Sequence, residues 1–136
     1  MKFNEKLRYC RKIFGLTQAQ MAEELNVTKR MIAYYESGER NPGLRTINTA
    51  SKFFGVSINY FLLDSETDPG KNFIEKSYHY ELERYRNSNL VRNTMNNILA
   101  AGGNYIDPDD PFWDFMRDSI AEVIMYSIKE RGYLNA

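Results

Sequence analysis

The sequence LTQAQMAEELNVTKRMIAYYESGERNP, residues 16–42, decides the fold. Thr17 and Gln20 form a capping-box pattern, in which a hydroxyl and an amide side chain satisfy the free amides that begin a helix. Asn26 stands where that helix ends in a left-handed residue, a conformation that asparagine tolerates better than most other non-glycine residues. Thr28 then caps a second helix. The stretch therefore predicts two short helices joined by a tight turn.

Apolar residues spaced three or four apart predict further helices on both sides of this stretch. One is expected from about Phe3 to Phe14, where Gly15 stops it. Another follows the Asn-Pro-Gly turn and ends at Gly55, and a short one follows the Ser57 cap. Five short helices are thus expected in the first 63 residues, and the chain shows no strand pattern or internal repeat. The sequence predicts an all-α protein.

Residues 64–71 contain no large apolar side chain and are expected to form a linker. A polar helix over about 73–87 and a clearer apolar stripe over 90–99 follow it. A last helix is expected from Asp110-Pro111 to about Arg131, because the first residue caps a helix and proline suits its first position. We therefore expect a five-helix domain over residues 1–63, a linker, and a helical segment over 72–136.

The two parts carry opposite charge, although 18 Lys and Arg balance 18 Asp and Glu over the whole chain. Residues 1–63 hold ten basic and five acidic side chains, a net charge of +5. Residues 64–136 hold eight and thirteen, a net charge of −5. This asymmetry favours a basic module that meets a polyanion and an acidic module with another role.

The sequence also indicates a cellular compartment. Cys10 is the only cysteine, which excludes an internal disulfide. The N-terminus has no signal-peptide pattern, and no apolar run approaches the roughly 20 residues that span a bilayer. A soluble, cytoplasmic protein without a membrane partner is expected.

Residues 16–42 resemble the DNA-binding domain of the lambda-repressor-like, or Cro/repressor, helix-turn-helix family, and the resemblance extends over about residues 3–63. In such domains the second helix of the motif enters the major groove of double-stranded DNA. The resemblance assigns base contacts to Thr28, Lys29, Arg30 and Tyr34. It assigns contacts with the sugar-phosphate backbone to Gln18, Ser37, Arg40 and Asn41.

Arg30 is the principal base reader that we expect, because arginine reaches O6 and N7 of guanine with two hydrogen bonds. Tyr34 lies one turn later, where its ring could pack on a thymine methyl or its hydroxyl could bond a base or a phosphate. Arg40 is expected to contribute affinity rather than sequence preference.

The resemblance also implies a structural ion pair between Arg11 and Glu36, which fixes the first helix against the second helix of the motif. Two residues depart from the family pattern. Asn26 replaces the usual turn glycine, and Tyr35 stands where tryptophan or leucine is common. Neither change is expected to alter the fold.

Other chemistry-bearing residues are expected to be structural. Cys10 lies on the apolar face of its helix without a histidine placed to activate it, so it is expected in the core. His79 is the only histidine, which leaves no second imidazole for a metal site. Asp107, Asp109 and Asp110 lack the calcium-loop signature and are expected to cap a helix or face solvent. Aromatic residues near the C-terminus favour a core or an interface over a ligand pocket.

These features predict a transcriptional regulator, with no enzyme activity, cofactor or metal. We expect a repressor that forms a homodimer through its C-terminal helices and binds an inverted-repeat operator. The competing hypothesis is an antitoxin-type protein, whose acidic C-terminal half binds a protein partner while its N-terminal half autoregulates. A self-cleaving peptidase half, with its serine and lysine, is not recognisable in the sequence.

Overall fold

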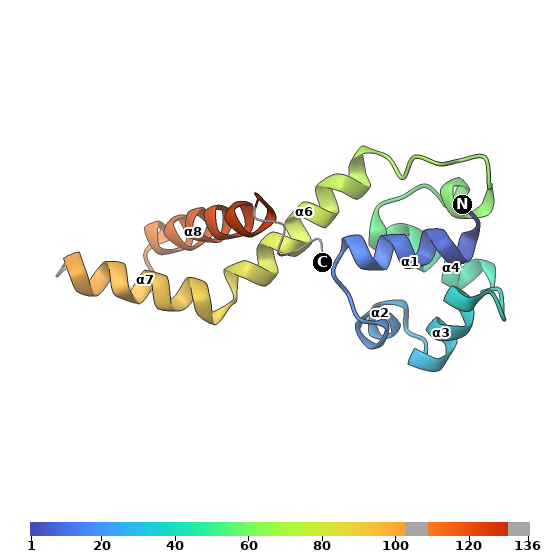
Figure 1. Cartoon of the computed structure of the whole chain (residues 1–136), viewed down its shortest axis with the longest axis horizontal. Coiled ribbons are helices and arrows are strands. Elements are labelled where there is room, and N and C mark those ends of the chain that lie inside the picture. Colours follow the sequence, from blue (N-terminus) through green and yellow to red (C-terminus); the bar gives the residue numbers. More distant parts are fainter. Residues whose placement is uncertain (103–108, 131–136) are drawn as a thin grey trace. The chain divides into compact units, whose positions relative to one another are not determined.

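The computed structural model of the chain describes residues 1–102 and 109–130, and Figure 1 shows it as helices joined by short connections. These residues form eight α-helices and no strand, which confirms the all-α fold. In chain order the helices are α1 (Phe3–Ile13), α2 (Gln18–Leu25), α3 (Lys29–Ser37), α4 (Leu44–Phe54), α5 (Ile58–Leu62), α6 (Lys71–Arg86), α7 (Asn89–Gly102) and α8 (Pro111–Glu130). The chain divides into two compact units, Met1–Tyr78 and His79–Ala136.

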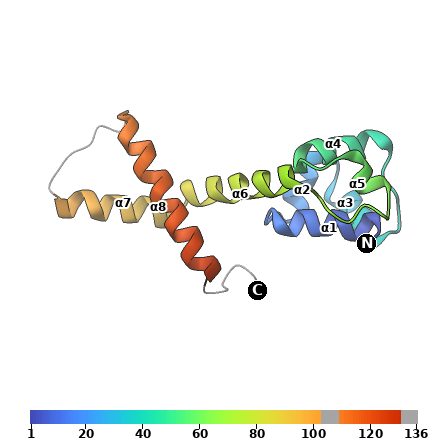
Figure 2. The same ribbon diagram turned by 90° about the horizontal axis from the view of Figure 1, so that it is seen from above.

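The N-terminal unit encloses one apolar core between helices α1 to α5, which Figure 2 shows gathered together. Each helix contributes the face on which its apolar residues recur, because burying that stripe stabilises a short helix more than its own propensity does. The fully buried side chains include Leu7 of α1, Phe14 just after α1, Met21 of α2, Ile32 of α3 and Phe54 of α4. The Phe14 and Phe54 rings meet edge to face, with centroids 4.9 Å apart.

The helix ends of the motif form as the sequence predicts. The Thr17 hydroxyl accepts a 3.1 Å hydrogen bond from the Gln20 amide, and the Gln20 side chain accepts one of 2.9 Å from the Thr17 amide. Asn26 ends α2 with φ 56° and ψ 44°, in the left-handed region. The Thr28 hydroxyl accepts a 3.2 Å bond from the Met31 amide and so begins α3.

Lys6 is a buried cation that sequence periodicity did not reveal. Its side chain is 0% exposed, and Nζ lies 4.8 Å from the centre of the Tyr60 ring. Nζ donates hydrogen bonds of 2.6, 2.8 and 2.5 Å to the carbonyls of Tyr60, Leu63 and Glu66. A lysine is buried only when its charge is compensated, and here the carbonyls at the end of α5 compensate it. Lys6 therefore fastens the segment after α5 to α1.

The start of α6 also packs in the N-terminal unit. Phe73 is 1% exposed, and its ring stacks on Phe14 with centroids 5.6 Å apart. Gly55, with φ +73°, allows this approach, because a Cβ there would lie 2.8 Å from Lys76 Cδ and 3.3 Å from the Asn72 carbonyl oxygen. The compact unit thus continues beyond the expected linker. The functional division into residues 1–63, 64–71 and 72–136 remains a prediction.

The C-terminal unit is built on α7 and α8, which cross in Figure 2. Val91, Met95 and Ala121 form its buried centre. The partly buried residues around them are Leu82, Tyr85, Trp113, Met116, Ile120 and Ile124. Asp110 caps α8 by accepting a 2.9 Å bond from the Phe112 amide, as expected. Asp107 and the predicted helix end near Arg131 lie outside the described residues.

Candidate nucleic-acid interface

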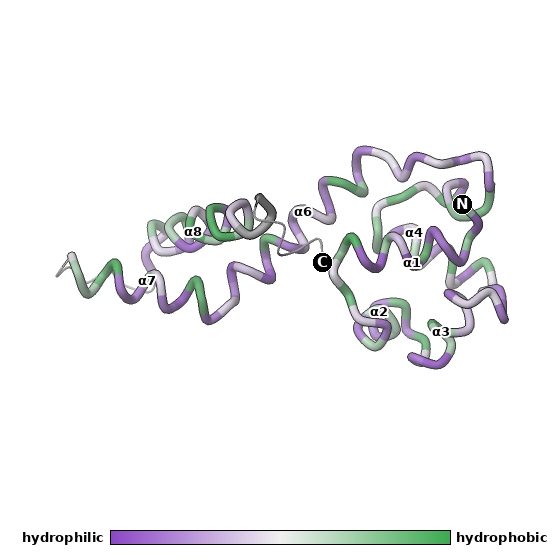
Figure 3. Tube along the Cα trace, in the orientation of Figure 1, coloured by the Kyte–Doolittle hydropathy of each residue, from purple (hydrophilic) through white to green (hydrophobic). Residues whose placement is uncertain are grey.

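Helix α3 presents one face to the core and leaves its first residues on the surface. Ile32, Tyr35 and Glu36 are buried, whereas Thr28, Lys29 and Arg30 are exposed. The beginning of α3 accordingly appears as a hydrophilic stretch of the tube in Figure 3. Because α3 packs on α2 and α1, its positively charged N-terminal residues face solvent. This geometry suits insertion of a helix start into a groove.

Arg30, Tyr34 and Arg40 form one contiguous group, here named the arginine–tyrosine cluster. Arg30 Nε donates a 2.8 Å hydrogen bond to the Tyr34 hydroxyl. The Arg30 and Arg40 guanidinium carbons lie 5.4 and 4.9 Å from the centre of the Tyr34 ring. Cation–π attraction at such distances orients both side chains. The cluster therefore joins an expected base reader to an expected backbone contact.

The loop after α3 is bonded to the end of the helix. The Ser37 hydroxyl donates a 3.1 Å bond to the Tyr34 carbonyl and accepts one of 3.3 Å from the Glu39 amide. The Arg40 amide donates to the Tyr34 carbonyl over 3.3 Å. Gly38 makes this reversal possible with φ 82°. The loop thereby holds Arg40 beside the exposed part of α3.

The remaining predicted contact residues occupy different positions. Thr28 caps α3, so its oxygen already accepts one bond while its hydroxyl hydrogen can donate to a ligand. Lys29 and Asn41 are exposed at opposite ends of the α3 segment. Gln18 is half-buried as the first residue of α2. The arginine–tyrosine cluster is the part of the predicted set that is joined by direct side-chain contacts in the described structure.

The orientation of α3 is fixed by a buried carboxylate. Glu36 is 1% exposed, and its oxygens accept bonds of 2.9 Å from both Nε and Nη2 of Arg11. Arg8 and Asn4 of α1 donate to the Glu36 carbonyl over 3.3 and 3.4 Å, two contacts that sequence reasoning missed. A bidentate pair of this kind sets both distance and angle between two helices. Its role is to position α3.

Cys10 is buried next to Tyr60 in this unit. Burial raises the pKa of the Cys10 thiol from 9.0 to about 12, since a thiolate would lose its hydration there. Burial also raises the pKa of Tyr60, and the neighbouring Cys10 adds to the effect. Both groups are neutral at physiological pH. A neutral, enclosed thiol is a core residue and a poor nucleophile, as the sequence suggested.

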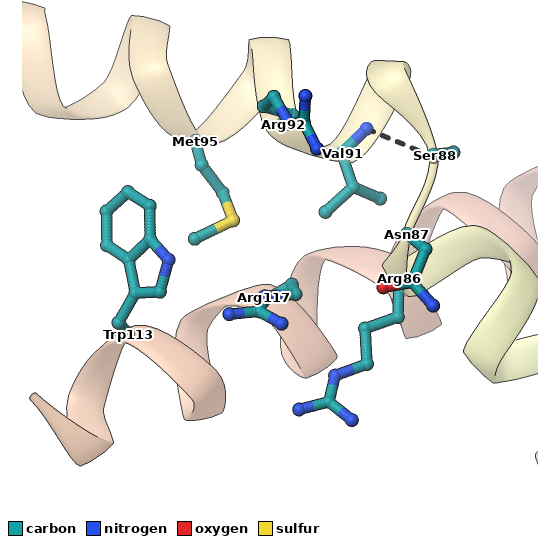
Figure 4. A pocket seen from close by; sticks show the side chains of 8 residues that line it. All are labelled: Arg86, Asn87, Ser88, Val91, Arg92, Met95, Trp113 and Arg117. Carbon is teal, nitrogen blue, oxygen red and sulfur yellow. Dashed lines mark hydrogen bonds between the residues drawn. The ribbon is translucent and has the colours of Figure 1, made fainter. Parts of the chain in front are cut away.

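The C-terminal unit contains a pocket of about 230 Å³, drawn in Figure 4. Its lining comprises Arg86, Asn87, Ser88, Val91, Arg92, Met95, Trp113 and Arg117. Arg86 and Arg117 are engaged by acidic residues of α8: Arg86 Nε lies 2.8 Å from Asp118 and Arg117 Nη2 lies 3.0 Å from Asp114. The Ser88 hydroxyl donates to the Tyr85 carbonyl. Arg86, Arg117 and Ser88 are thus tied into helix contacts, and the lining formed by the described residues includes no carboxylate, imidazole or thiol for acid–base chemistry.

Within residues 1–102 and 109–130, no helix combines the length and apolar character that a bilayer crossing needs.

Residues 7–61 match the protein-family model described as helix-turn-helix. The HTH-type transcriptional activator BcrR of Enterococcus faecalis is 38% identical over 86 residues, which are 59% of this chain and 42% of BcrR. The uncharacterized HTH-type transcriptional regulator YqaE of Bacillus subtilis is 32% identical over 129 residues, 95% of each chain. The cryptic phage CTXphi transcriptional repressor RstR of Vibrio cholerae is 36% identical over 48% of this chain and 60% of its own. This chain thus spans less than half of BcrR but nearly all of YqaE. No solved structure shows significant similarity.

Proposed function

Because the chain belongs to the helix-turn-helix family of transcriptional regulators, we propose that it is a dimeric, sequence-specific repressor whose helix α3 reads an inverted-repeat operator. The observation that carries this proposal is the arginine–tyrosine cluster on the exposed side of α3. It concentrates two cations where a helix start would meet the major groove. A binding function needs no cofactor or metal.

Base reading is assigned first to Arg30. Its Nε is engaged by the Tyr34 hydroxyl, so a bidentate contact with O6 and N7 of one guanine would use the N–H groups of the two terminal nitrogens. Lys29 and the Thr28 hydroxyl are exposed beside it and can reach the neighbouring base pairs. Tyr34 contributes by holding Arg30, in addition to any contact that its ring makes with a thymine methyl.

Backbone contacts are assigned to Gln18 at the start of α2, Ser37 at the end of α3, and Arg40 and Asn41 in the following loop. Such contacts fix the register of the protein on the duplex without reading sequence. Arg40 supplies charge at one end of the cluster, and its loss would reduce the salt dependence of binding.

The half-sites of an inverted-repeat operator lie in successive major grooves about 34 Å apart, and a dimer held by its C-terminal helices would supply one copy of α3 for each. A repressor needs only to occupy its site, which one small DNA-binding unit and a dimerising segment can achieve. RstR is named a repressor and BcrR an activator, so the direction of regulation requires a transcription assay. A DNA partner also supports a cytoplasmic site of action.

A second candidate function is an antitoxin-type protein that binds a basic partner through its acidic part. The net charge of −5 on residues 64–136 favours it. Co-purification of the product of a neighbouring gene in a fixed ratio with this chain would support this alternative. Purification of the chain alone, as a dimer, would count against it.

The proposal is tested by selecting bound DNA from a random pool with the full chain at near-physiological salt. Enrichment of an inverted repeat, followed by lower transcription from a promoter that carries it, is the expected result. Enrichment of a single half-site would contradict the dimeric part of the proposal. Weak, salt-sensitive binding without any enriched sequence would contradict sequence-specific reading by α3.

A further inference from the structure

Helix α8 carries a second apolar face that the described residues of the C-terminal unit do not bury. Phe112, Phe115, Val123 and Tyr126 have 51, 67, 65 and 66% of their surface exposed. At 100° per residue they fall, together with Ser119, within an arc of about 80° around the helix. We name these five residues the α8 stripe.

The α8 stripe lies away from the face that packs on α7. That packed face carries Trp113, Ile120, Ala121 and Ile124 against Val91 and Met95. Exposed aromatic residues scattered singly need no explanation, but a continuous row of them does. With aromatic side chains offering on the order of 200 Å² each, the stripe exposes roughly 400 Å² of apolar surface. The largest apolar patch on a monomeric protein is commonly of about this size and is often functional.

The order of residues along the stripe is symmetric about Ser119. Phe112 and Tyr126 lie seven residues before and after it, and Phe115 and Val123 lie four residues before and after it. In an antiparallel pair of identical helices related by a two-fold axis, each residue faces the residue equally distant on the other side of the axis. A stripe that is symmetric about its centre is therefore complementary to a second copy of itself.

Ser119 is suited to lie on such an axis. Its small side chain lets two helices approach closely, and its hydroxyl donates a 2.9 Å bond to the Phe115 carbonyl in its own helix. Because the hydroxyl is already satisfied, burying it between two copies leaves no orphan donor. The large residues on both sides then close over this centre.

We propose that α8 pairs with α8 of a second copy in antiparallel orientation, with the two-fold axis at Ser119. Phe112 then packs against the other copy's Tyr126, and Phe115 against its Val123. The inference rests on the proposed dimeric function and specifies its interface. Two stripes bury roughly 800 Å² together, and flanking side chains extend this toward the ~1,200 Å² at the low end of specific interfaces.

Cysteine cross-linking tests both the surface and the direction of pairing. In the full chain, Ser119→Cys is expected to form a disulfide between copies, because it faces itself across the axis. Phe112→Cys and Tyr126→Cys alone are expected not to cross-link, whereas the double variant with both changes is expected to do so. The unchanged chain is the control, since Cys10 is buried. Cross-linking by all three single variants would overturn the antiparallel arrangement in favour of a parallel one.

A charge placed in the stripe separates failure of this interface from failure of the proposed function. Val123→Glu is expected to convert the dimer to a monomer in sedimentation and to weaken binding to the inverted repeat at least tenfold. Binding to one half-site should stay unchanged, which also shows that the variant is folded. Leu90→Glu, at an apolar residue of α7 that is 54% exposed but outside the stripe, is the matched control. If the Val123→Glu variant remains dimeric, the proposed α8 interface is wrong but the dimeric function is not. If the unchanged chain binds its operator as a monomer, the proposed dimeric function itself is wrong.

Discussion

Arg30 Nε donates a 2.8 Å hydrogen bond to the Tyr34 hydroxyl one turn later on α3. The Tyr34 ring also lies beside the guanidinium groups of both Arg30 and Arg40. An arginine held in this way loses less side-chain freedom when it binds a base than a free one does. Under the proposed function, Tyr34 holds the two arginines ready to contact DNA, and its own role is largely to position them.

Tyr34→Phe tests this role, because it keeps the ring and removes only the acceptor of the Arg30 bond. We expect it to weaken operator binding by about 1 kcal/mol and to reduce preference at the same base pair that Arg30 reads. Titrations against single-base operator variants measure both effects. Tyr9→Phe, at an exposed tyrosine of α1, is the control. If preference falls at a different base pair, Tyr34 reads a base itself.

Glu36→Gln tests the buried pair that orients α3. It keeps the volume of the side chain but leaves Arg11, whose side chain is only 14% exposed, without its counter-charge. We expect a loss of about 3 kcal/mol in the free energy of unfolding, measured with urea. Glu39→Gln, at an exposed residue of the following loop, should change it by less than about 0.5 kcal/mol. Equal effects of the two changes would show that the Glu36 charge is not needed.

Lys6→Met tests the cation that fastens the segment after α5. The substitution keeps an unbranched apolar stem of nearly the same length and removes the donor to three carbonyls. We expect a destabilisation of about 2 kcal/mol. Hydrogen exchange should increase most at the Leu63 and Glu66 amides, whose bonds lie in that segment. Lys12→Met, at an exposed lysine of the same helix, should leave the exchange rates of these two amides unchanged. An identical increase in both variants would contradict the role of Lys6 in holding this segment.

Cys10 predicts a specific dependence of stability on alkaline pH. Its pKa is raised by burial from 9.0 to about 12 in the folded chain, so the unfolded chain releases this proton first. The stabilisation is fully present below pH 9.0 and is lost as pH rises toward 12. At pH 10.5 the loss is of order 2 kcal/mol. Between pH 8 and 10.5 the midpoint temperature of thermal unfolding should therefore decline less for Cys10→Ala than for the unchanged chain. Parallel declines of the two midpoints would contradict the assignment.

Local chemistry explains why the helices of the N-terminal unit were predictable. The Thr17 and Thr28 caps and the left-handed Asn26 act within a few residues of chain, so their patterns are visible in the sequence. The family resemblance also implied the pairing of Arg11 with Glu36, which lie 25 residues apart and meet in the structure. The comparison with known proteins confirms that resemblance.

Contacts between distant residues were not predictable in the same way. Lys6 bonds carbonyls that lie 54 to 60 residues later, and a backbone acceptor leaves no mark in the sequence. Phe73 joins the first core although it follows a polar stretch, because the glycine at position 55 lets α6 approach. On α8 the apolar residues form a wide face in the sequence, and only the structure divides them into a buried half and an exposed one.

The most direct test of the central claim, that α3 reads DNA, compares Arg30→Ala with Arg40→Ala on the selected operator and on each of its single-base variants. Arg30→Ala should weaken binding by about 1 to 3 kcal/mol and abolish preference at one base pair in each half-site. Arg40→Ala should weaken binding to all sequences by similar factors and reduce the salt dependence. Uniform losses across every operator variant for both proteins would contradict the assignment of base reading to Arg30.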